Sequence, residues 1–218
     1  MTAGRSILTT TGLLAAATLL AVGTASATGQ GAEAGNVLTH GSPGGTAVAV
    51  GDVLTASSNM VTLATEPGGS TGVTCNQSSF SATVTANPTA PGTATESLKA
   101  FSTGGTCTTN IAGATGVQSV AATGLPYAVS VSSGGAVTVQ GVSSTVVLSS
   151  LVGTLTCTYT APSLSGTASG TTSAISFTNQ QFNLSSGSEL CPASGYFTAT
   201  YTPVQDTSVS GSPSVFVN

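Results

Sequence analysis

Alternation of apolar and polar residues is the dominant pattern of this chain. The clearest run is GTLTCTYTA at 153–161, where Leu155, Cys157 and Tyr159 alternate with threonine. Residues 196–202 repeat the pattern with aromatic residues and alanine. Successive side chains of a β-strand point to opposite faces, so each run predicts a strand with one buried face and one wet face.

Turn signals separate these runs at regular intervals. Glycine, proline, asparagine and serine cluster at 66–70, 87–88, 133–135 and 185–188. About a dozen short strands spaced by such turns are typical of an all-β domain. No segment after residue 27 has a sustained helical period. We therefore expect an antiparallel β-sandwich, immunoglobulin-like or jelly-roll-like.

The first 27 residues differ from the rest and predict a secretory signal peptide. Arg5 supplies the positive start, residues 13–22 form a short apolar run, and Ala25 and Ala27 make an A-x-A cleavage motif. The apolar run is shorter than the ~20 residues that a membrane span needs. We expect this signal helix to be cleaved, leaving a secreted protein with no membrane segment.

The remaining chain divides into two parts. Residues 28–46 are rich in glycine, alanine and polar residues and predict a flexible N-terminal segment, which contains His40. Residues 47–218 are expected to form a single β-sandwich domain. Similar spacings between the cysteines leave an alternative, in which two immunoglobulin-like halves divide near 141–150.

The chain has four cysteines, and an even number in an exported protein favours disulfides. They are Cys75, Cys107, Cys157 and Cys191. Three pairings are possible. We favour Cys75–Cys107 and Cys157–Cys191, because the two enclosed segments are similar in length and each contains strand and turn signals. No C-x-x-C or H-x-x-x-H spacing is present, so we expect no metal site.

Charge is scarce. Charged residues make up 4% of the chain and the formal net charge is −4. Lys99 is the only lysine, and Arg5, the only arginine, lies in the predicted signal peptide. Binding to nucleic acid needs many phosphate contacts from basic side chains, so nucleic acid is excluded as a partner.

The residues that could carry catalysis are few and scattered. His40, the only histidine, lies in a segment rich in glycine and proline and is interpreted as a solvated linker residue. An acid-pair hydrolase would need two carboxylates across one cleft. The candidates for such a pair are Asp52, Glu66, Glu96, Glu189 and Asp206. No motif joins them, so we expect no catalytic residues, no cofactor and no enzyme activity.

Four stretches resemble a group of small secreted actinobacterial proteins that are described only by their export signal. These are NPTAPGTATESL, GLPYAVSVSSGGAVTV, ISFTNQQF and LCPASGYFTATYTPVQD, at 87–98, 124–139, 175–182 and 190–206. The resemblance implies secretion and a disulfide-bonded β fold. It implies no activity and assigns no functional residue.

Three functions remain open at this point. The leading expectation is a non-catalytic structural or interaction protein at the cell exterior, with an extracellular or cell-wall partner that the sequence does not identify. The alternative is a carrier that binds a small apolar ligand between the sheets. The third is the acid-pair hydrolase. The sequence leaves the oligomeric state open.

Overall fold

Antiparallel β-strands account for most of the chain in the computed structural model, which describes residues 35–218. The strands are β1 (Leu38–His40), β2 (Thr46–Ala47), β3 (Val53–Ser58), β4 (Val61–Ala64), β5 (Gly72–Ala86), β6 (Thr93–Thr109), β7 (Ala114–Thr123), β8 (Tyr127–Ser132), β9 (Ala136–Ser150), β10 (Gly153–Ser169), β11 (Ala174–Gly187), β12 (Ser194–Tyr201), β13 (Gln205–Asp206) and β14 (Val215–Val217). All their pairings are antiparallel.

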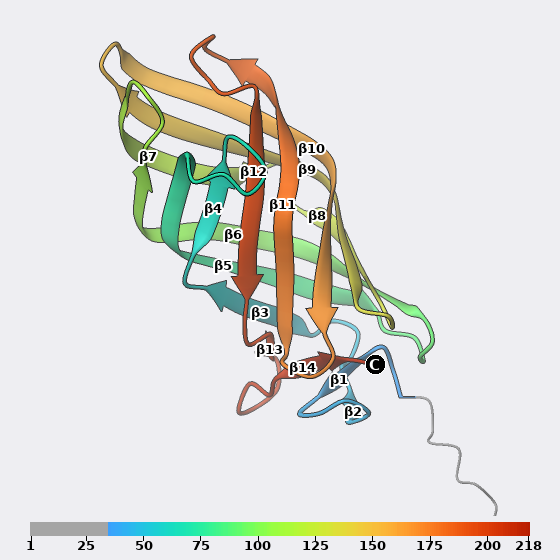
Figure 1. Ribbon diagram of the computed structural model, residues 1–218. Helices are drawn as coiled ribbons and strands as arrows, with labels where there is room; N and C mark the ends of the chain where they lie inside the picture. Colours follow the sequence, from blue (N-terminus) through green and yellow to red (C-terminus); the bar gives the residue numbers. More distant parts are fainter. Residues whose placement is uncertain (1–34) are drawn as a thin grey trace, which may run out of the picture. The chain divides into compact units, whose positions relative to one another are not determined.

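The main ladder closes on itself. Its neighbours follow the order β5, β4, β12, β11, β10, β9, β8 and β6, and β6 then pairs with β5. Strands β3 and β13 extend from β5, and β7 pairs with β9 outside this path. Figure 1 shows β11 and β12 running in front of the long strands β5 and β6. The two layers of strands therefore enclose an interior.

Two long strands change neighbours part-way along their length. Strand β5 pairs with β4 through its first residues, 72–75, and with β3 through 78–83. Strand β9 pairs with β8 through 137–139 and with β7 through 143–150. Strands β5 and β9 thus each pair with two short strands along one edge.

The core consists of the inward side chains of these strands. In β10, Cys157 and Tyr159 are buried, whereas Thr156 and Thr160 on the opposite face are exposed. This is the pattern that the alternation predicts. The prediction of an all-β fold, built from packed antiparallel sheets and two disulfides, is confirmed.

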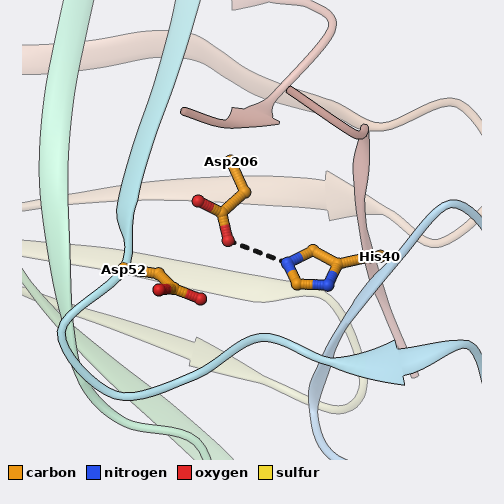
Figure 2. A group of neighbouring side chains, drawn as sticks. All are labelled: His40, Asp52 and Asp206. Carbon is orange, nitrogen blue, oxygen red and sulfur yellow. Dashed lines mark hydrogen bonds and ion pairs between the residues drawn. The ribbon is translucent and has the colours of Figure 1, made fainter. Parts of the chain in front are cut away.

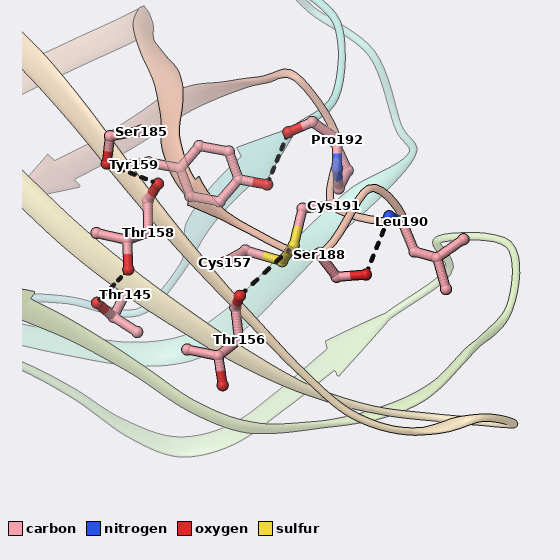
Figure 3. The surroundings of a disulfide bond; sticks show 10 residues. All are labelled: Thr145, Thr156, Cys157, Thr158, Tyr159, Ser185, Ser188, Leu190, Cys191 and Pro192. Atoms are coloured by element: carbon pink, nitrogen blue, oxygen red, sulfur yellow. Dashed lines mark hydrogen bonds between the residues drawn. A yellow bond between two sulfur atoms is a disulfide. The ribbon is translucent and has the colours of Figure 1, made fainter.

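Both favoured disulfides are present. Cys75 pairs with Cys107 directly across the β5–β6 ladder, with a Cα–Cα distance of 4.0 Å. Cys157 of β10 pairs with Cys191 in the β11–β12 connection, at 5.8 Å. Figure 3 shows the Tyr159 hydroxyl beside this second disulfide, donating to the carbonyl oxygen of Pro192. The described residues contain no free cysteine.

A small second sheet corrects one expectation. The segment predicted to be flexible forms β1 and β2 within residues 36–47, and β1 pairs with β14 near the other end of the chain. Leu38 is buried, and Val37 and Thr39 are fully buried. The partner strand is distant in sequence, so the local glycine-rich composition did not indicate it. Residues 28–34 of that segment lie outside the described residues.

The described residues belong to one compact unit. Strand β9 spans 136–150 and runs through the region where the two-half alternative places its division. The polypeptide therefore has no linker there. The predicted signal peptide, with Ala25 and Ala27, lies outside the described residues.

Candidate functional site

The interior of the strand ring contains a cavity of about 120 Å³. Its lining combines aliphatic side chains with many aromatic ones. The aromatic lining residues are Phe80, Phe101, Tyr127, Tyr159, Phe177, Phe182, Phe197 and Tyr201. An apolar protein cavity of ~150 Å³ is known to stay dry and to hold benzene. The cavity here is therefore of the size that accepts a small ring compound.

Glu96 of β6 is the ionisable residue that breaks this apolar lining. It lies between Ala94 and Leu98 on the inward face of β6, and its partners across the neighbouring strands are Val84 and Val129. Its side chain lines the cavity and the residue is 7% exposed. Burial raises the pKa of the Glu96 carboxyl from about 4.5 to about 7, because removal from water penalises the charged form.

The three tyrosine hydroxyls of the lining are already bound to the protein. Tyr159 donates to Pro192, and the Tyr201 hydroxyl lies 3.1 Å from the Ser78 hydroxyl. The Tyr127 hydroxyl lies against the carbonyl oxygen of Ser143 at 2.8 Å and accepts from the Ser143 N–H at 3.1 Å.

The other hydroxyls of the lining have partners as well. Thr103 donates to the carbonyl oxygen of Val120, and Ser144 donates to that of Ala121. The Ser143 hydroxyl accepts from Thr123. Among residues 35–218, no hydrogen bond reaches the Glu96 carboxyl. Glu96 is thus a polar side chain of the lining that makes no hydrogen bond within residues 35–218.

The backbone ladder is broken beside this interior. Strand β6 pairs with β8 only through Thr93–Leu98, and β7 pairs with β9. Beyond Leu98, β6 and β7 face each other without a ladder and are bridged by the Thr103–Val120 hydrogen bond of 2.6 Å. Half-buried Phe101 and Ala122 line the cavity at this break.

A second cluster joins the small sheet to the main one. Figure 2 shows His40, at the end of β1, pointing toward Asp206 of β13, with Asp52 beside them. The His40 Nε2 atom lies 2.8 Å from Asp206 Oδ2, and Asp206 is fully buried. The second oxygen of Asp206 accepts from the Ser208 N–H, and Asp52 accepts from the Ala49 N–H.

This cluster corrects the interpretation of His40 as a solvated linker residue. Its side chain is 13% exposed and bound to a buried carboxylate. One ligand atom each from His40, Asp52 and Asp206 lie within 4.8 Å of one another, so these described residues could hold a metal ion. The hydrogen bond between His40 Nε2 and Asp206 Oδ2 already links two of these three side chains.

The cluster lacks the contacts of a hydrolase triad. A Ser–His–Asp arrangement needs a serine hydroxyl bound to the imidazole, and none of the described serines donates to His40. Of the other acids considered for a catalytic pair, Glu66 and Glu189 are exposed on the surface. The structure therefore brings Asp52 and Asp206 together at His40 and places Glu96 alone in the cavity.

No protein-family model, curated protein or solved structure matches this chain. Within residues 35–218, no helix has the length and apolar character required to cross a bilayer. The cavity and the histidine cluster are accordingly the two features on which a functional hypothesis can be based.

Proposed function

We propose that this protein is a secreted, non-catalytic carrier that binds a small, largely apolar molecule inside the ring of strands. One observation carries the proposal: an apolar, aromatic-lined cavity contains a single carboxyl that no described residue satisfies. Ligand sites are typically apolar pockets with a few convergent polar groups. A ligand would enter between β6 and β7, because no backbone ladder has to open there.

Secretion is part of the same proposal. Two disulfides are typical of proteins that fold in an oxidising compartment, and the sequence predicts a cleaved signal peptide. One disulfide links neighbouring strands β5 and β6, and the other links β10 to the β11–β12 connection, so both stabilise the folded ring. The structural or interaction role at the cell exterior stays a prediction, for which the chain offers exposed Leu151 and Val152 at the β9–β10 turn.

Calorimetric titration with ethylbenzene tests the proposal on the purified protein with both disulfides intact. We expect saturable binding of one molecule and a rise in the midpoint of thermal unfolding, because a ligand that binds only the folded state stabilises it. Absence of binding by ethylbenzene and by other single-ring compounds would contradict the proposal.

A variant pair locates the bound molecule. Ala122 lines the cavity at the break, whereas its neighbour Ala121 is exposed on the outer face of β7. We expect Ala122→Trp to abolish ethylbenzene binding by filling the entrance, and Ala121→Trp to leave it unchanged. Equal binding by both variants would place the ligand elsewhere on the molecule.

A further inference from the structure

We propose that the molecule held in this cavity is a small amphiphilic amine in its protonated form, with the Glu96 carboxylate as its counterion. This inference rests on the proposed function and adds the chemical class of the ligand. The cavity supplies two features that a cationic, partly apolar molecule needs, a lone carboxylate and a wall of aromatic rings.

The first argument is charge balance inside the fold. Among residues 35–218 the basic side chains are Lys99, which is exposed, and His40, which is bound to Asp206. Neither lines the cavity. An ionised Glu96 is therefore a buried charge without a protein partner, and a buried charge is strongly unfavourable unless it is paired. A ligand ammonium group would supply the missing partner and donate to the carboxylate.

The second argument is the distribution of the aromatic residues. The chain has six phenylalanines and four tyrosines, and all of them except Tyr196 and Phe216 line the cavity. The faces of aromatic rings attract cations, and this attraction grows when the cation is removed from water. An anionic ligand would be repelled by Glu96 and would gain nothing from the rings.

The third argument is that, among the described residues, no other carboxylate and no basic side chain lines the cavity around Glu96. The neighbouring strands present Val84 and Val129, and the other titratable groups of the lining are tyrosine hydroxyls with partners of their own. A ligand donor that enters the cavity thus meets one carboxylate, which is a stronger acceptor than the lining hydroxyls. The apolar part of the ligand must fit a volume of about 120 Å³, which limits it to about one ring.

A pair of matched ligands tests this inference. Benzylammonium and ethylbenzene have nearly the same volume and differ by an ammonium group in place of a methyl group. We expect the wild-type protein at pH 8 to bind benzylammonium more tightly than ethylbenzene. We expect Glu96→Gln to weaken benzylammonium binding about tenfold or more, the scale of a charge-assisted hydrogen bond, and to leave ethylbenzene binding within about twofold.

The exposed acid Glu66 provides the control, because Glu66→Gln removes the same charge from the surface and should change neither affinity. The thermal midpoint of each variant shows that it is folded. If ethylbenzene binds but Glu96→Gln leaves benzylammonium binding unchanged, this inference is wrong and the proposed function stands. If neither ligand binds the wild-type protein, both are wrong.

The pH dependence gives an independent readout. Primary amines titrate near ~10 and stay protonated from pH 5.5 to 8.5, whereas Glu96 loses its proton across that range. Benzylammonium affinity should therefore rise with pH in the wild-type protein and stay flat in Glu96→Gln. Ethylbenzene affinity should show no such rise. A benzylammonium affinity independent of pH in the wild-type protein would overturn the assignment of Glu96 as counterion.

Discussion

Glu96 places an ionisable carboxyl in an interior that disfavours its charged form. Its carboxyl is buried among apolar and aromatic side chains, and its pKa is raised to about 7 by the loss of water. Apolar side chains occupy most other inward positions of the ladder and contribute to folding by burial. A buried acid at this position lowers the stability of the folded protein at neutral pH. Residues that lower stability in this way are typically found at functional sites.

This cost predicts how stability depends on pH. The folded-state pKa of Glu96 lies above its unfolded value, so the folded protein binds more protons between about pH 4.5 and 7. The contribution of this group to stability is therefore full below pH 4.5 and is lost as the pH rises through 7, a fall of about 3 kcal/mol. Urea unfolding between pH 4 and 8 measures the fall.

Glu96→Gln should remove this contribution and be more stable than the wild type at pH 8, whereas Glu66→Gln should follow the wild-type curve. The same pH dependence in wild type and Glu96→Gln would show that another group causes it.

The sequence contained part of the information about Glu96. Ala94, Glu96 and Leu98 alternate with hydroxyl residues and Lys99, so the acid lies on the apolar side of its strand. Lys99, which follows Leu98, is exposed. A single alternating strand does not reveal that aromatic residues of β10, β11 and β12, far along the chain, gather opposite this acid.

At the scale of elements, the small sheet is fastened to the main one by the pair of His40 and Asp206. Strand β1 ends at His40, and β13 pairs with β3 through Asp206. The hydrogen bond between them joins residues 166 positions apart in the sequence. Asp206 is completely buried. This hydrogen bond and the β1–β14 pairing therefore join the first strand of the described chain to its last two strands.

His40→Ala should lower the free energy of unfolding by about 3 kcal/mol, because it leaves the buried Asp206 carboxylate without its imidazole partner. Denaturant unfolding measures the loss, and Ser42→Ala, an exposed change in the same segment, serves as the control. A double-mutant cycle with Asp206→Asn should give a coupling energy well above zero. An additive cycle would contradict the role of the pair as a fastening.

The elements that the sequence predicted well are those with local alternation, such as residues 153–161 and 196–201. The glycine, serine and threonine composition of residues 163–172 is typical of a loop or an edge strand. Residues 163–169 nevertheless continue β10 and pair with β9 and β11. Gly166 explains part of the difference, since a Cβ there would lie 2.7 Å from the Phe177 ring. The glycine that suggests a loop instead makes room for a neighbouring side chain.

At the scale of the whole molecule, two disulfides reinforce the ladder. Their sequence separations are 32 and 34 residues, so the chain-entropy model predicts that each stabilises the fold by about 4 kcal/mol. Replacing both cysteines of either pair by alanine should therefore give similar losses, measured by urea unfolding. A loss below about 1 kcal/mol for one pair would show that its link adds little to what the surrounding strands already fix.

Closure of the ladder also limits the strand edges that are open to pairing with another copy of the protein. With 4% charged residues, molecules repel one another weakly, and added salt has little charge to screen. Free sheet edges would then invite strand pairing between copies. Because most strands of the ring pair with a neighbour on both sides, the ring offers few free backbone donors and acceptors to the strands of another copy.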